Sequence, residues 1–176
     1  MDQAYEQQGS AQRWVVMGVS GCGKSTVGQA LASALALEFV EGDDYHPAAN
    51  VARMAAGIPL TDADRAVWLQ ALCERLRAAQ AQGRGLVLSC SALKRSYRDL
   101  LRSADPALRF AHLDGSRELI AARMQARSQH YMPLSLLDSQ LRDLQPLQPG
   151  EAGLTLELHR PPQQLVAQIL ARRAGG

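Results

Sequence analysis

Residues 18–26 read Gly18-Val19-Ser20-Gly21-Cys22-Gly23-Lys24-Ser25-Thr26, which matches the G-x-x-x-x-G-K-S pattern of a phosphate-binding loop. The apolar run 14–17 before it predicts a buried strand, and residues 27–37 after it have helix-forming composition. In this order, backbone N–H groups and a helix N-terminus can surround phosphate oxygens. We therefore expect residues 18–26 to bind ATP, with Lys24 on the β- and γ-phosphates and the Ser25 hydroxyl on Mg²⁺. A glycine-rich turn with a chance lysine is the alternative.

The composition of the 176-residue chain is ordinary for a globular protein, with 47% hydrophobic and 20% charged residues. Its net charge of +2 gives no electrostatic footprint for nucleic acid or for an anionic membrane surface. No apolar stretch approaches a membrane span, and the polar N-terminus does not read as a signal peptide. The three cysteines lack metal-ligand spacing and suit a reducing compartment. We expect a cytoplasmic protein with no nucleic-acid and no membrane partner.

Five short strand candidates alternate with helical segments along the chain, at residues 14–17, 38–41, 85–90, 109–114 and 154–158. This alternation predicts an α/β fold with a parallel sheet and helices on both faces. Thr61 is the expected N-cap of the helix between the second and third strands, and Pro161-Pro162 the expected start of the last helix. We expect residues 1–13 to form a flexible N-terminus and residues 14–176 a single domain.

The surroundings of the loop narrow the class of nucleotide chemistry. The chain has neither the N-K-x-D nor the D-x-x-G motif of a GTPase, and its third strand ends without a carboxylate. A carboxylate instead follows the second strand, at Asp43. There it could accept a proton from an attacking hydroxyl or hold magnesium through water. A plain Gly-Asp-Asp turn is the alternative, and spacing alone leaves both interpretations open.

Several groups of residues resemble the bacterial thermoresistant-type gluconokinases over residues 15–144. They are Asp43-x-x-His46-Pro47-x-x-Asn50, Gly57-x-Pro59-Leu60-x-Asp62-x-Asp64-Arg65-x-x-Trp68-Leu69, Cys90-Ser91-Ala92-Leu93-Lys94-x-x-Tyr97-Arg98, Arg123-x-x-x-Arg127-x-x-His130-Tyr131-Met132 and Leu137-x-Ser139-Gln140. The resemblance implies an adenylate-kinase-like, three-layer P-loop kinase fold with a five-stranded parallel sheet and a small helical lid at about residues 123–145.

The same resemblance implies the activity. A kinase of this family transfers the γ-phosphoryl group of ATP, with Mg²⁺, to the 6-hydroxyl of D-gluconate. The product, 6-phospho-D-gluconate, feeds the pentose phosphate and Entner–Doudoroff routes. The resemblance also implies a homodimer.

Gluconate is a small polyol carboxylate, so its pocket needs cations and polar groups. Lys94 and Arg98 stand four residues apart at the start of a helix, which would place both on one face. We predict that this pair binds gluconate, with His46, Arg53 and His130 as further candidates for the same pocket. A solvated basic helix start is the alternative for the pair, and a helix cap the alternative for His46.

Arg123 and Arg127 share one face of the helix after the fourth strand. The resemblance implies that they close as a lid over the transferring phosphoryl group, whose charge a guanidinium stabilises. An exposed basic helix is the alternative. The predicted catalytic residues are therefore Lys24, Asp43, Arg123 and Arg127, with Ser25 and Asp43 also on the metal.

Two rival functions differ in class. One is a kinase for shikimate or another polyol acid, although the triple-glycine and D-x-D motifs of shikimate kinases are absent. The other is a nucleotide-binding regulator without turnover. The presence of Lys24, Ser25, Asp43 and Arg127 argues against this regulator.

Overall fold

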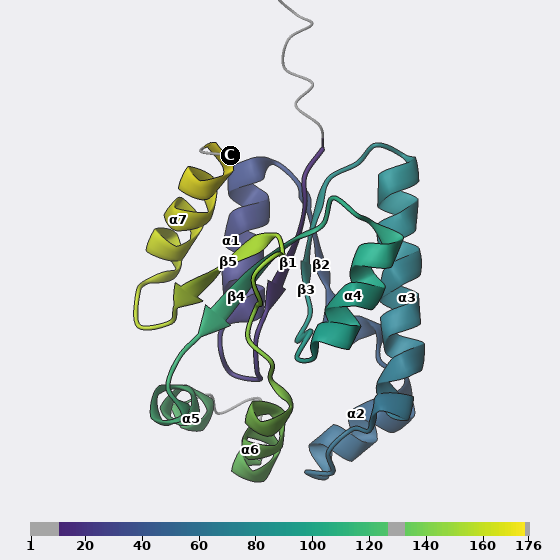
Figure 1. Ribbon diagram of the computed structural model, residues 1–176. Helices are drawn as coiled ribbons and strands as arrows, with labels where there is room; N and C mark the ends of the chain where they lie inside the picture. Colours follow the sequence, from purple (N-terminus) through teal and green to yellow (C-terminus); the bar gives the residue numbers. More distant parts are fainter. Residues whose placement is uncertain (1–10, 127–132, 175–176) are drawn as a thin grey trace, which may run out of the picture.

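The computed structural model describes residues 11–126 and 133–174, which are built around a five-stranded sheet (Figure 1). The strands, in spatial order, are β2 (Glu38–Glu41), β3 (Leu86–Ser89), β1 (Arg13–Met17), β4 (Arg109–Asp114) and β5 (Gly153–Glu157). Every neighbouring pair is parallel, and Val15 of β1 lies between Leu88 of β3 and Phe110 of β4. The predicted parallel sheet is confirmed, with strand bounds that differ from the predicted ones by at most a residue at each end.

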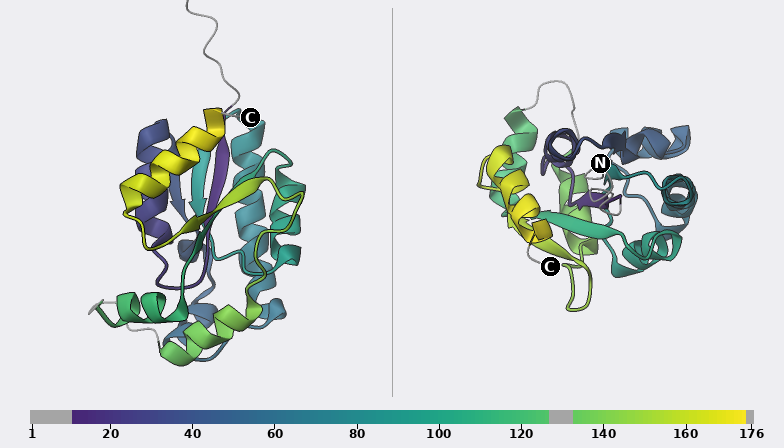
Figure 2. Two further views of the ribbon diagram at one scale, coloured as in Figure 1. Left: turned by 60° about the vertical axis from the view of Figure 1, so that its left-hand side comes forward. Right: turned by 90° about the horizontal axis from the view of Figure 1, so that it is seen from above.

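Helices cover both faces of this sheet and the side on which its strands have their carboxyl ends, which we call the carboxyl edge. Their bounds are α1 (Lys24–Leu35), α2 (Ala48–Ala55), α3 (Asp62–Ala81), α4 (Arg95–Ala104), α5 (Arg117–Ala126), α6 (Leu134–Asp143) and α7 (Pro162–Ala174), with a 3₁₀ segment η1 (Gly42–Tyr45) after β2. Helices α1 and α7 pack on one face, and α3 and α4 on the other (Figures 1 and 2). The remaining helices, α2, α5 and α6, gather beyond the carboxyl ends of the strands. In open α/β sheets, ligands bind at this edge.

Strand β1 is buried on both faces because an apolar cluster lies on each side of it. Val16 faces the cluster formed with α1 and α7, whereas Val15 and Met17 face the cluster formed with α3 and α4. The sequence of such a central parallel strand is therefore a continuous apolar run, without alternation of apolar and polar residues. No helix within the two described ranges has both the length and the apolar character needed to cross a membrane.

Strand β1 begins one residue earlier than the sequence predicts. Arg13, expected in the flexible N-terminus, is the first residue of β1 and only 9% exposed. Its guanidinium forms an ion pair with the fully buried carboxylate of Asp105 after α4. A buried charge needs such a partner, and pairs distant in sequence are not visible in composition.

Helix α3 begins where the sequence predicts, at a complete capping box. The Thr61 hydroxyl accepts the Asp64 N–H at 3.1 Å, and the Asp64 carboxylate accepts the Thr61 N–H at 2.9 Å. This cap fixes the first turn of α3. Arg65 and Trp68, three residues apart, both face inward, with exposed fractions of 6% and 1%.

Candidate active site

Two adjoining cavities open at the carboxyl edge of the sheet. The first, which we call the phosphate cavity, has a volume of about 580 Å³ and is lined by the glycine-rich loop, the start of α1, Glu41 and Met124. The second, which we call the side cavity, has a volume of about 530 Å³ and reaches under α2 and α3 to α6. Ser20, Lys24, Asp43 and Asp44 line both. Two small molecules bound in these cavities would therefore meet at Lys24 and Asp43.

The glycine-rich loop has the backbone that a phosphate cradle requires. Gly23 is the N-cap of α1 with a φ of 90°, in the left-handed region that glycine adopts without strain. A Cβ built there meets no heavy atom within 4 Å, so the cap faces open space. Within the loop, the Cys22 side chain is fully buried. The Lys24 Nζ donates to the Val19 carbonyl at 3.0 Å. The positive end of α1 and the Lys24 ammonium thus point to one anion-binding site.

Glu41, the last residue of β2, is a site residue that the sequence analysis missed. Its Oε2 accepts the Ser25 hydroxyl, and its Oε1 accepts the Ser89 hydroxyl at 2.6 Å. The carboxylate beside the predicted metal-binding hydroxyl is therefore Glu41, whereas Asp43 lies two residues further on, in η1. The sequence did offer a clue to Glu41, because it stands directly before Gly42 and Asp43. It therefore ends a strand beside the glycine-rich loop.

The Ser25–Glu41 pair fits a magnesium ion. Across the described residues, no three His, Cys, Asp or Glu side chains converge as a metal site. Magnesium does not need such a cage, because it usually takes one or two protein oxygens and completes its shell with phosphates and water. One hydroxyl and one carboxylate at the phosphate cavity satisfy that requirement.

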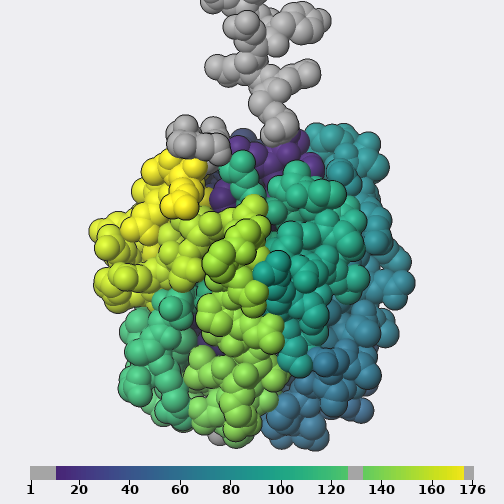
Figure 3. All heavy atoms as spheres, viewed as in Figure 1, coloured from purple at the N-terminus to yellow at the C-terminus, as the bar shows by residue number. Residues whose placement is uncertain are grey.

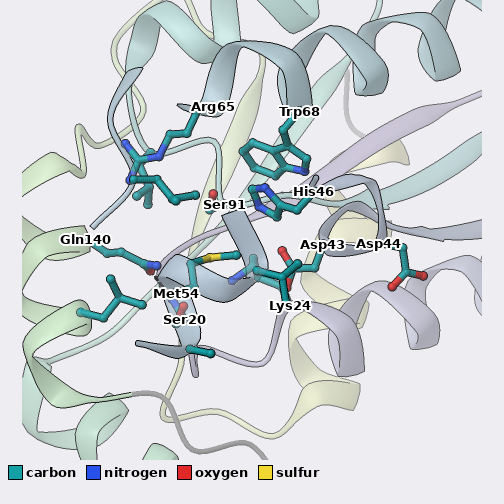
Figure 4. A pocket seen from close by; sticks show the side chains of 15 residues that line it. Ser20, Lys24, Asp43, Asp44, His46, Met54, Arg65, Trp68, Ser91 and Gln140 are labelled. Carbon is teal, nitrogen blue, oxygen red and sulfur yellow. Dashed lines mark hydrogen bonds between the residues drawn. The ribbon is translucent and has the colours of Figure 1, made fainter. Parts of the chain in front are cut away.

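Gly42 holds Asp43 at the boundary between the cavities. A Cβ at Gly42 would lie 2.0 Å from the Ser89 carbonyl oxygen, so only glycine fits against β3. The Gly42 N–H donates to the Ser89 hydroxyl at 3.2 Å, and its carbonyl accepts the Trp68 indole N–H at 2.8 Å. Asp43 follows Gly42, is exposed and lines both cavities. Figure 4 shows it beside Lys24 in the side cavity.

An aromatic stack forms one wall of the side cavity. The rings of His46 and Trp68 lie 4.2 Å apart at 14°, and the Asn50 amide lies 3.3 Å from the His46 Nδ1. Burial, together with the nearby Arg65 guanidinium, lowers the pKa of His46 although Asp43 opposes this shift. His46 is therefore neutral at pH 7. It lines the side cavity and does not cap α2, whose N-cap is Pro47.

The side chains of Lys94 and Arg98 have different partners, and neither residue is among those that line the two cavities. Lys94 is the N-cap of α4, and its carbonyl accepts the Arg98 N–H at 3.2 Å. Its ammonium forms an ion pair with Asp62 at 2.9 Å. Arg98 is fully buried and bound to Glu151 at 2.8 Å and to the carbonyl of Ala92 at 2.9 Å. This geometry replaces the gluconate-binding interpretation of Arg98 with a structural one.

The other basic residues predicted to bind the substrate or to form the lid also lie outside the cavity linings or outside the described residues. Arg53 is 47% exposed and pairs with Asp64 at 2.8 Å, away from the cavity linings. Arg123 of α5 donates to the Leu158 carbonyl at 2.6 Å, after β5. Arg127 and His130 lie outside the described residues. Among the described residues, the linings of both cavities lack Arg53, Lys94, Arg98 and Arg123.

The side cavity contains a cation that the sequence analysis left without a role. Arg65 reaches in from α3, and Figure 4 shows its side chain at the end of the cavity away from Lys24 and Asp43. Its Nη1 donates to the Tyr97 hydroxyl and to the Asp143 carboxylate, each at 3.0 Å. Asp143 is the last residue of α6, so Arg65 connects α3, α4 and α6.

Comparisons with known proteins agree with this architecture. A family model described as an AAA domain matches residues 14–147. The chain is 54% identical over 131 residues to a gluconokinase of Gluconobacter oxydans (strain 621H), covering 74% of each protein. It is similar to the crystal structure of a gluconokinase from Sinorhizobium meliloti 1021, with a TM-score of 0.84, 45% identity and coverage of 92% and 91%. An unliganded sugar kinase from Janibacter sp. HTCC2649 superposes with a TM-score of 0.88 at 48% identity, covering 92% of this chain and 93% of that one.

Proposed function

We propose that this chain, which belongs to the gluconokinase family and contains an AAA domain, transfers the γ-phosphoryl group of ATP to the 6-hydroxyl of D-gluconate. The observation that carries the proposal is the pair of cavities that meet at Lys24 and Asp43. One has the loop and helix N-terminus of a triphosphate site. The other has the polar and aromatic wall of a small-molecule site. Phosphoryl transfer requires that donor and acceptor meet in line at one point.

In this proposal the nucleotide and its metal occupy the phosphate cavity. Lys24 turns from the Val19 carbonyl to the β- and γ-phosphates. Ser25 and Glu41 would hold Mg²⁺, which supplies charge neutralisation on the phosphates when bound. Asp43, which was predicted on the metal, remains a candidate for binding it through water.

The acceptor hydroxyl occupies the side of Asp43 that faces the side cavity. Asp43 accepts its proton, the hydroxyl oxygen forms a bond to the γ-phosphorus, and the bond to the bridging oxygen of ADP breaks. Lys24, with Arg123 and Arg127 from the predicted lid, stabilises the charge on the transferring group. His46 remains a candidate for contacts to gluconate from the side cavity. Lys94 and Arg53, which line neither cavity, and His130 also remain candidates.

The assembly and location remain parts of the proposal. The family resemblance supports a homodimer. The low net charge and the cysteine content support a cytoplasmic protein with no nucleic-acid or membrane partner. Light scattering of the purified protein tests the first point, because a monomeric mass at assay concentration contradicts it.

A coupled assay of ADP release over a panel of acceptors tests the reaction. We expect turnover with gluconate that is at least about 100-fold faster than with glucose, shikimate or nucleoside monophosphates, as a site built around specific polar groups discriminates strongly. Equal rates on all acceptors would remove the substrate assignment. ATP binding without turnover on any acceptor would favour the regulator.

A further inference from the structure

Among the residues that the structure describes, the lysine and arginine side chains that line the side cavity are Lys24 and Arg65. Lys24 belongs to the loop and is needed by the phosphates of the nucleotide. His46 is neutral at pH 7, because burial lowers its pKa. Within residues 11–126 and 133–174, Arg65 is therefore the cation of this lining that remains for an anionic acceptor.

The guanidinium of Arg65 has hydrogen-bonding capacity to spare. It carries five N–H donors, and in residues 11–126 and 133–174 its hydrogen bonds run from Nη1 alone, to Tyr97 and Asp143. The Nε and Nη2 groups remain for a ligand in the cavity that Arg65 lines. A guanidinium edge with two parallel N–H groups matches a carboxylate bidentately.

We propose that Arg65 binds the carboxylate of the sugar acid and thereby selects the hydroxyl at the opposite end of the chain for phosphorylation. The inference rests on the proposed function and deepens it. Arg65 lies at one end of the side cavity and Asp43 with Lys24 at the other (Figure 4). An acid with its carboxylate on C1 and a hydroxyl on C6 spans such a cavity in one orientation.

Electrostatics at the two ends favour the same orientation. Asp43 and Asp44 line the end near the loop and repel a carboxylate there. Arg65, which is only 6% exposed, attracts it at the far end. Low exposure strengthens this attraction because less water screens it.

Two neighbours hold the guanidinium in place. The Tyr97 hydroxyl accepts from Arg65 and donates to Asp62, and burial raises the pKa of Tyr97, so the hydroxyl stays protonated and this relay is maintained. Asp143 holds Nη1 from α6. Tyr97 and Asp143 are thus positioning residues, which act on the substrate through Arg65.

The test compares D-gluconate with D-gluconamide, which has a neutral carboxamide in place of the carboxylate. For the wild type we expect kcat/KM for gluconate to exceed that for gluconamide by about 10- to 100-fold, as one charge-assisted contact provides. In Arg65→Gln the two values should come within about threefold of each other, with unchanged affinity for ATP. Arg65→Lys should retain part of the preference, because it keeps the charge without the fork. Arg75→Gln is the matched control, because Arg75 is on the same helix and pairs with Glu38 at 2.6 Å away from the cavity.

The outcomes distinguish a failure of the proposed function from a failure of the inference about Arg65. A wild type that phosphorylates no sugar acid contradicts the proposed function and this inference together. A wild type that prefers gluconate, with an Arg65→Gln variant that keeps the full preference, contradicts the inference alone. If Arg65→Gln does not fold, an Arg65→Lys variant with wild-type preference is the contradicting result. If the preferred acid differs from gluconate, the same ratio is measured with that acid and its amide. NMR of the product gives a second readout, since losing the anchor should allow phosphate on hydroxyls other than the terminal one.

Discussion

The backbone N–H of Ser20, in the glycine-rich loop, donates a 2.7 Å hydrogen bond to the Oε1 of Gln140 on α6. Because a backbone N–H can only donate, this contact fixes which end of the carboxamide faces the loop. Gln140 is 9% exposed and lines the side cavity, so its amide nitrogen is available on the cavity side. Helix α6, within the predicted lid region, is thus tied to the loop.

Replacement of Gln140 should loosen this tie. Gln140→Leu leaves the Ser20 N–H without its acceptor, and we expect a loss of about 1–3 kcal/mol in the free energy of unfolding. The value of kcat/KM for both substrates should fall about tenfold, because a small misplacement of the loop is costly. Steady-state kinetics and urea unfolding measure both effects. Ser135→Ala, at an exposed position of α6, is the control, and equal behaviour of the two variants would contradict the role of Gln140.

Asp43→Asn should separate chemistry from binding. The Asn amide cannot take the proton from the attacking hydroxyl of gluconate. We therefore expect kcat to fall by about 10²- to 10⁴-fold, the usual contribution of a general base. The dissociation constant for ATP, measured by calorimetry, should stay within a small factor of wild type. Near-normal turnover would remove Asp43 from catalysis and leave it as a turn residue.

Glu41→Gln should change the dependence on magnesium. The amide keeps one oxygen for a hydrogen bond from Ser89 or Ser25 but loses the negative charge that attracts the metal. We expect the Mg²⁺ concentration for half-maximal activity to rise about 10- to 100-fold, as observed for weakened metal sites. Glu38→Gln, an exposed position on the same strand, is the matched control. An unchanged magnesium dependence would return the metal role to Asp43.

The buried Arg98–Glu151 pair should govern acid stability. Burial opposes ionisation of Glu151, but hydrogen bonds from Arg98, the Gln148 N–H and Arg102 outweigh it and lower the pKa to about 2. A carboxylate with a depressed pKa stabilises the fold above its ordinary pKa of about 4.5, and this stability is lost as the pH falls towards about 2. Thermal unfolding between pH 6 and 2 should show this loss, and Glu151→Gln should flatten it.

Arg98→Met tests the same pair from its other side. It leaves the Glu151 carboxylate buried without its main partner, which should cost about 3–5 kcal/mol of stability at pH 7. In the folded fraction, the KM for gluconate should stay unchanged, since Arg98 is absent from the lining of the side cavity. A raised KM without a loss of stability would restore its role in substrate binding.

His112 of β4 should make stability depend on pH nearer neutrality. It is 2% exposed, and neither ring nitrogen has a hydrogen-bond partner in the described part of the chain. Burial lowers its pKa, with Arg98 adding to the shift and Asp114 opposing it. As the pH falls, His112 therefore binds a proton in the unfolded chain before it does so in the folded one. The free energy of unfolding decreases as the pH drops below about 6.5. His112→Leu should reduce the slope of unfolding free energy between pH 7 and 5, and an identical slope would contradict this.

The elements that depend on consecutive residues were predictable. The loop, the five strands and the capped start at Thr61 each follow from a local pattern. Contacts between distant segments were not. Arg98 pairs with Glu151 because the chain between α6 and β5 lies against α4, as the yellow-green and teal surfaces of Figure 3 show. Nothing in the spacing of Lys94 and Arg98 reveals that covering segment.

By itself, the sequence determined that a strand, a glycine-rich loop and a helix form a phosphate site, because backbone conformation and glycine positions decide this locally. Only the tertiary structure decided which charged side chains complete it. Parallel pairing of β2 with β3 brings Glu41 to Ser25 and Ser89. The start of α3 places Asp62 beside the Lys94 ammonium, and Arg65 lines the side cavity while bonded to α4 and α6. Burial and pairing depend on the assembled sheet and its helices, so the positions of these charges become visible only in the folded chain.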